Sequence, residues 1–175
     1  LGLFLRVYDL GSKSFWADEI LSIRASERLV DMNSILKPDP ENAHPPLYFI
    51  TLKFWSSLGD SEFFLRLYSV LFGLFSIPAT FLLAKQYFNY KTSVVAAFLV
   101  SISPLLLRFE REVRMYPLFM FLTIVSIFFF IKALRYGNSY NWIGYVFFMT
   151  LTLYTHYHGF LVLASSWLFY FLSLN

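Results

Sequence analysis

The stretch YGNSYNWIGYVFFMTLTLYTHYHGFLVLASSWLFYFLSLN, residues 136–175, decides the fold, because it contains no Asp, Glu, Lys or Arg. An α-helix rises about 1.5 Å per residue, so roughly 20 apolar residues cross the hydrocarbon core of a bilayer. The stretch is about twice that length. We therefore predict a helical hairpin that turns at the strongly polar cluster THYHG, residues 155–159.

Three more segments without charge precede this hairpin, at residues 67–84, 92–107 and 115–131. Residues 1–10 are interpreted as the end of a truncated first span, since the chain starts without Met inside an apolar run. The prediction is an all-α polytopic membrane protein with about six transmembrane helices, five of them in residues 63–175, and part of a longer protein. The composition agrees, because 14% charged residues is far below the roughly 25% typical of soluble domains.

Alternating crossings predict that residues 11–62, 108–114 and 156–159 lie on one side of the membrane. All eleven acidic residues fall within residues 9–62 and 110–112. The loops on the other side contain Lys85, Lys91, Lys132 and Arg135 without acids, which is typical of cytoplasmic loops. The acidic side is therefore predicted to be extracytoplasmic, at the plasma membrane if the source is prokaryotic. The chain has no Cys, hence no disulfide or thiolate metal site, and a net charge of +3 does not imply nucleic acid.

The long acidic loop, residues 11–62, is expected to be partly helical. Apolar positions within residues 16–32 predict an amphipathic helix on the membrane surface, followed by a turn-rich connector at residues 34–43. The apolar run at residues 47–58 is too short for an ordinary span and favours an interfacial or re-entrant helix. Ser61 is the predicted N-cap of the next span, and the position of Arg66 near its start permits snorkelling towards water.

Four short motifs follow one another in the chain: Trp16-Ala17-Asp18-Glu19, His44-Pro45-Pro46-Leu47-Tyr48, Glu62-Phe63-Phe64-Leu65-Arg66-Leu67 and Arg111-Glu112-Val113-Arg114-Met115-Tyr116. In this order they resemble the amino-terminal half of the membrane-embedded glycosyltransferases with the C fold. The similar branch contains the dolichyl-phosphate-mannose protein mannosyltransferases and the bacterial lipid A aminoarabinose transferases. The resemblance implies extracytoplasmic transfer of a sugar from a polyprenyl-phosphate donor to a protein, lipid or glycan acceptor, usually with inversion.

Inverting transfer needs a carboxylate that takes the proton of the acceptor hydroxyl and cations that stabilise the departing phosphate. Asp18 is the predicted general base, with Glu112 as a second acidic site. Glu19 is either catalytic or orients the neighbours of Asp18. The alternative is that Asp18 and Glu19 only favour the first turn of a helix.

Arg108, Arg111 and Arg114 are three residues apart, so on a helix they would share one face. Arg111 and Arg114 are predicted to bind the donor phosphate, while Arg108 is expected only to anchor the helix to lipid headgroups. Tyr116 either donates a hydrogen bond to the phosphate or is an ordinary interfacial tyrosine.

His44, His156 and His158 are all the histidines of the chain. They are predicted to line the substrate site, and Asp18, Glu112 and His156 are the candidates for a divalent metal site. A polar turn at the interface is the alternative for His156 and His158. No other cofactor is expected. The function alternative is a polytopic transporter or lipid-binding scaffold, which should place charges deep within its spans.

Overall fold

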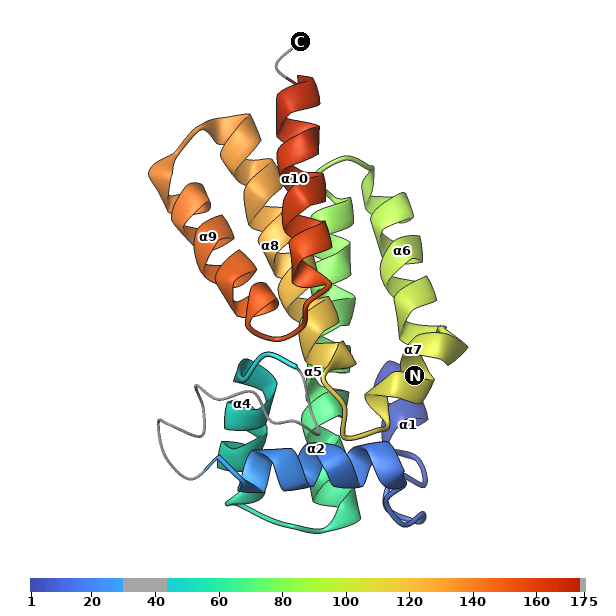
Figure 1. The fold of residues 1–175 in the computed structure, drawn as a ribbon. Coiled ribbons are helices and arrows are strands. Elements are labelled where there is room, and N and C mark those ends of the chain that lie inside the picture. Colours follow the sequence, from blue (N-terminus) through green and yellow to red (C-terminus); the bar gives the residue numbers. More distant parts are fainter. Residues whose placement is uncertain (30–43, 174–175) are drawn as a thin grey trace.

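The computed structural model describes residues 1–29 and 44–173, which form helices and turns and contain no strand. The helices are α1 (Gly2–Val7), α2 (Ala17–Glu27), α4 (Leu47–Ser56), α5 (Glu62–Ala84), α6 (Tyr90–Ile102), α7 (Pro104–Glu110), α8 (Tyr116–Tyr136), α9 (Ser139–Leu153) and α10 (Gly159–Ser173). Figure 1 shows α5, α6, α8, α9 and α10 running up and down, with α2 lying across their lower end. The connector predicted at residues 34–43 lies outside the described residues.

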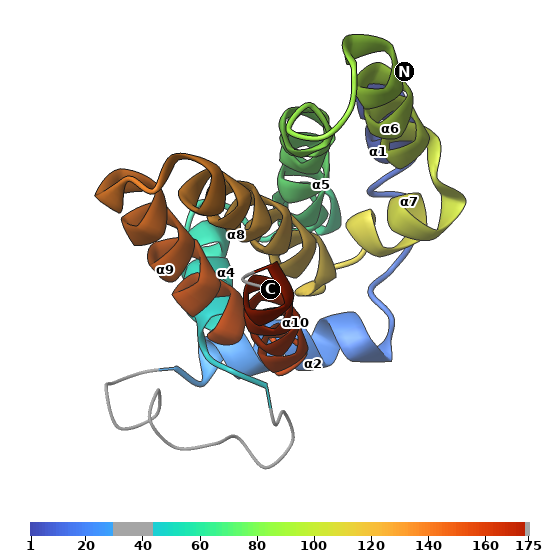
Figure 2. The same ribbon diagram turned by 90° about the horizontal axis from the view of Figure 1, so that it is seen from above.

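The helices α5 and α8 form the centre of the bundle, with α6 packed on α5 and α9 packed on α8 (Figures 1 and 2). Ser61 caps α5, as predicted, because its hydroxyl accepts a hydrogen bond from the Phe64 N–H at 3.2 Å. Helix α8 ends at Tyr136 and is capped by Gly137, whose φ of 64° is left-handed, a conformation that glycine adopts without steric cost.

Two helices of the described part, α5 and α8, are long and apolar enough to cross a membrane, and α6 with α7 makes a third if the bent pair counts as one span. The total of about six spans stays a prediction. The hairpin turn is where the sequence predicts it, because α9 ends at Leu153 and α10 begins at Gly159. Helix α10 exposes Leu161, Leu168 and Phe171, an apolar outer surface that suits contact with lipid.

The span predicted at residues 92–107 is not one straight helix, because the chain bends by 55° between α6 and α7. Pro104 is the cause. Proline has no N–H for the helix ladder, and it disfavours helical backbone at the residue before it. Ser103 accordingly has extended backbone, with φ −61° and ψ 118°. The bend carries α7 and the residues after it towards α1 and α2 (Figure 2).

Helix α2 exists within the predicted segment, but its buried face is not the apolar one that we expected. It buries Glu19, Ser22 and Ser26 together with Ala25, whereas Ile20 is exposed. The reason is that α2 packs on α4 through small side chains and directs Glu19 towards a partner within the bundle. Helix α4 in turn places Tyr48 and Leu52 in the core shared with α5 and α8.

Candidate active site

The carboxylate of Glu19 joins three parts of the chain. Glu19 lies in the first turn of α2 and is only 1% exposed. Its Oε1 accepts hydrogen bonds from Arg66 Nε and from the Val113 N–H, both at 2.9 Å. Its Oε2 accepts from Arg66 Nη2 at 2.8 Å and from the Trp16 N–H at 3.3 Å. This carboxylate therefore ties α2 to α5 and to the segment before α8.

Arg66 does not snorkel, although its position permits it: the side chain is buried in the first turns of α5. Besides Glu19, its guanidinium donates to the carbonyls of Leu10, Lys13 and Ser14 at 2.8 to 3.3 Å. An arginine has five N–H donors, and the partners of Arg66 occupy all of them. Arg66 thereby shapes the loop that precedes Asp18.

Asp18 differs from its neighbour Glu19 in being half exposed, with 45% of its side chain accessible. Its Oδ2 lies 3.7 Å from Arg114 Nη2, and Arg114 Nη1 donates to the Asp18 carbonyl at 3.2 Å. Arg114 also approaches the hydroxyl of Tyr116, with its guanidinium over the tyrosine ring. Asp18 thus combines an accessible carboxylate with a fixed position, while Glu19 has the geometry of a positioning residue.

The three arginines do not share one helix face as predicted, because α7 ends at Glu110 and residues 111–115 form no helix. Arg111 turns towards Tyr8 after α1 and Arg108 towards Glu112, whereas Arg114 turns towards Asp18. Arg108 lines a cleft and lies 3.8 Å from Glu112. The structure thus places Arg108 beside the site, which the interpretation as a headgroup anchor did not anticipate.

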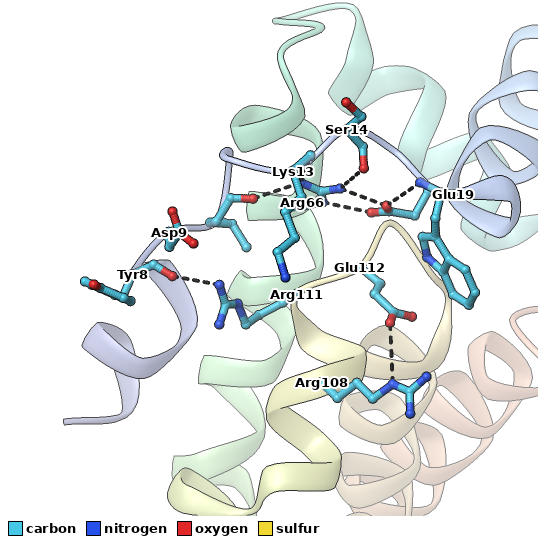
Figure 3. A pocket seen from close by; sticks show the side chains of 11 residues that line it. Tyr8, Asp9, Lys13, Ser14, Glu19, Arg66, Arg108, Arg111 and Glu112 are labelled. Atoms are coloured by element: carbon cyan, nitrogen blue, oxygen red, sulfur yellow. Dashed lines mark hydrogen bonds and ion pairs between the residues drawn. The ribbon is translucent and has the colours of Figure 1, made fainter.

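That cleft has a volume of about 510 Å³ and lies between α1, the loop before α2 and the end of α7. Figure 3 shows Lys13 and Arg111 extending into it, with the paired Arg66 and Glu19 in the upper part of the view and Glu112 below them. Its lining residues are Tyr8, Asp9, Leu10, Lys13, Ser14, Trp16, Glu19, Arg66, Arg108, Arg111 and Glu112. Four of them are basic and three are acidic, so the cleft suits an anionic group beside carboxylates.

Glu112 has a raised pKa, chiefly because it is partly buried. Arg108 and Arg114 lower this pKa, whereas the carboxylates of Glu19 and Asp18 raise it further. Burial and like charges both disfavour the ionised form of a carboxyl group. Glu112 is therefore poised to hold a proton more readily than an ordinary glutamate.

The histidines form a cluster near Tyr116 and Arg114. The ring of His156 lies 5.0 Å from that of His44 and 6.0 Å from that of Tyr116, centre to centre, and the Nδ1 atoms of His156 and His158 are 2.9 Å apart. Burial is the main cause that lowers the pKa of His156 to about 4 and also lowers the pKa of His44. Neutral imidazoles beside Arg114 are the result, able to exchange hydrogen bonds with a polar ligand.

Residues 1–29 and 44–173 contain no group of three or more His, Cys, Asp or Glu placed to hold a metal ion. The divalent metal at Asp18, Glu112 and His156 stays a prediction. The structure brings the sequence candidates to one end of the bundle in two groups, the cleft with Glu19, Arg111 and Glu112, and the cluster of His44, Tyr116, His156 and His158. Asp18 and Arg114 lie between these groups.

Two buried arginines were missed as site components, Arg66 and Arg6. The pairing of Arg66 had a signal in the sequence, because a charge within an apolar span needs a partner, and Glu19 was a motif carboxylate whose role was left open between catalysis and positioning. Arg6 forms an ion pair with Glu110, and neither residue belongs to the motif pattern. Lys13 was also missed, since a lone lysine in a loop carries no signal.

Comparison with known families matches residues 43–175 to the dolichyl-phosphate-mannose-protein mannosyltransferase family. Comparison with curated proteins and with solved structures finds no match. The matched region starts after Asp18 and Glu19, so their roles rest on geometry. It includes the motifs at residues 44–48, 62–67 and 111–116. The chain belongs to the dolichyl-phosphate-mannose-protein mannosyltransferase family, whose members are membrane glycosyltransferases.

Proposed function

We propose that this chain carries the donor site and the general base of an inverting glycosyltransferase. The donor is a sugar on a polyprenyl phosphate, and the acceptor is a hydroxyl group of a protein, lipid or glycan on the extracytoplasmic side. One observation carries the proposal: the half-exposed Asp18 carboxylate lies near Arg114, beside a cleft whose lining includes the cationic side chains of Lys13, Arg108 and Arg111. Family membership supports it.

In the proposed reaction Asp18 accepts the proton of the acceptor hydroxyl. The hydroxyl oxygen forms a bond to the anomeric carbon from the face opposite the phosphate, and the bond from that carbon to the phosphate oxygen breaks. The electron pair leaves with the polyprenyl phosphate, whose growing negative charge is stabilised by Lys13, Arg108 and Arg111. Preorganised cations of this kind act most strongly where charge develops in the transition state.

The residues around Asp18 have supporting roles. Arg114 holds Asp18 in place by contacting both the backbone carbonyl and the side-chain carboxylate of Asp18. Tyr116 lies against Arg114. Glu19 and Arg66 hold the first turn of α2 and the loop before it in place. His44, His156 and His158 are assigned to the polar wall facing the bound substrate on the other side of Arg114.

A transfer assay tests the function. The full-length protein, purified in detergent, is incubated with short-chain polyprenyl-phosphate sugars that carry a labelled sugar and with peptide, lipid and glycan acceptors. We expect release of polyprenyl phosphate that depends on an acceptor, with inverted configuration at the anomeric carbon. Donor binding without any transfer to these acceptors would favour a lipid-binding scaffold, and movement of the donor across vesicle membranes would favour a transporter.

The sidedness of the site can be measured directly because the chain has no Cys. Single cysteines replace Asp18, Glu112 or His158, with Lys91 on the opposite loop as the matched control. An impermeant thiol reagent added to intact cells is expected to label the first three positions and not the fourth. Labelling of one site position only after the membrane is opened would contradict a shared extracytoplasmic site.

A further inference from the structure

Arg6 and Glu110 form an ion pair that is fully buried within the described part of the chain. Arg6 is on α1 and Glu110 is the last residue of α7. Arg6 Nη2 lies 2.8 Å from Glu110 Oε2, and the two side chains are 0% and 1% exposed. A buried ion pair costs much desolvation and contributes stability only with good geometry, so its presence calls for a role beyond general packing.

The same guanidinium also reaches the end of α6. Arg6 Nη1 donates to the Ser101 carbonyl at 3.0 Å and to the Gly2 carbonyl at 2.9 Å. The last carbonyls of a helix have no partner within it, and α6 ends at Ile102 where Pro104 breaks the chain. One arginine thus caps the end of α6 and holds the end of α7, so it spans the bend from both sides.

Helix α5 is adapted to this pair. A Cβ atom at Gly73 would lie 2.5 Å from Glu110 Cδ and 2.6 Å from its Oε1, so glycine leaves the space that the carboxylate fills. A second link joins the same elements, because Arg111 Nη2 donates to the Tyr8 carbonyl at 2.7 Å. The direction of α7 is therefore fixed against α1 and α5 together.

We propose that Arg6 and Glu110 are positioning residues that fix the bend between α6 and α7 and thereby present Arg108, Arg111 and Glu112 to the cleft. Pro104 permits a bend but does not determine its angle. The Arg6–Glu110 pair does, because Arg6 contacts both the end of α6 and the end of α7. The inference rests on the proposed function in one respect, that the cleft binds the phosphate of the donor.

The alternative is that the pair only stabilises the fold, and two variants separate the possibilities. Arg6→Met/Glu110→Leu removes both charges, and such replacements are often neutral or stabilising, so the protein is expected to fold. Gly73→Ala keeps both charges and displaces the Glu110 carboxylate. Ser76→Ala, one turn further along α5 and equally buried, is the matched control.

The readout is the distance between two spin labels in the full-length protein. The labels replace the exposed Leu105 on α7 and Phe147 on α9, any cysteine elsewhere having been changed to Ser. Both test variants are expected to broaden or shift a distance distribution that Ser76→Ala leaves unchanged. Their dissociation constant for a polyprenyl-phosphate sugar is expected to rise about tenfold, the loss of one contact to a charged group, while the unfolding temperature of the double variant stays near that of the wild type.

Unchanged distances in both variants would show that the bend does not depend on the pair, and the proposal would be overturned. Altered distances with unaltered donor affinity would also overturn it, because the position of α7 would then not matter for binding. Failure of the wild type to bind the donor would instead contradict the proposed function, and the spin-label distances would still decide whether the pair orients α7.

Discussion

Asp18→Asn is expected to lower the turnover of sugar transfer by ~10²–10⁴-fold, the usual loss when a general base is removed. Asparagine keeps the size and the hydrogen-bonding capacity of aspartate but cannot take a proton at neutral pH. The side chain is half exposed and its contact to Arg114 is 3.7 Å long, so the substitution removes little that holds the fold. Donor affinity and unfolding temperature are expected to stay close to those of the wild type.

The competing explanation for Asp18 is that it only favours the first turn of α2. Asparagine caps helices about as well as aspartate, so activity close to that of the wild type in Asp18→Asn would support the structural role and remove the proposed base. Asp60→Asn is the matched control, because Asp60 is exposed, lies before α5 and has no place in the site. Glu19→Gln is unsuitable as a control, since the Glu19 carboxylate is buried against Arg66.

The features of the fold that the sequence predicts are local ones. The hairpin turn at residues 155–159 follows from the length of an apolar stretch and one polar interruption, and the cap at Ser61 follows from a hydroxyl residue before an apolar run. Each depends on a few neighbouring residues and on the thickness of a bilayer. The family follows from four motifs in order, and the match to residues 43–175 confirms it.

The features that the sequence did not predict depend on where helices end or bend. The spacing of Arg108, Arg111 and Arg114 implies a common face only if the helix continues, and it ends at Glu110. Pro104 was the available signal for the bend. The segment was nevertheless interpreted as one span, because the residues around Pro104 are mostly apolar. The pairing of Arg6 with Glu110 brings together residues of α1 and α7 that are far apart in the chain, which no local pattern can reveal.

The charge pattern identified the acidic end of the bundle but did not show which acidic side chain is accessible and which is paired. Asp18 and Glu19 are neighbours, yet consecutive helix positions point in different directions, so one carboxylate is half exposed and the other buried. The sequence shows two acids in a row. Only the position of Arg66 on α5 shows which of them is already neutralised by a partner.

Arg66→Met is expected to be the most destabilising single substitution of the site, with a loss of about 3–5 kcal/mol in the free energy of unfolding. The apolar part of the side chain is largely retained, so the change isolates the guanidinium. Its removal leaves the Glu19 carboxylate buried without a compensating charge, and the carbonyls of Leu10 and Lys13 lose their donor. Chemical unfolding in detergent, followed by tryptophan fluorescence, measures the loss.

Arg24→Met is the matched control, because Arg24 is an exposed residue of α2 and surface substitutions of this kind usually change stability by less than about 0.5 kcal/mol. Arg66→Met/Glu19→Leu should recover part of the stability, since no buried charge is then left unpaired. The recovery should be incomplete, because the Val113 N–H and the loop carbonyls still lack partners. Stability of Arg66→Met equal to that of Arg24→Met would contradict the role of this pair. Asp18 would then need another explanation for its position, because the loop before it is held through Arg66.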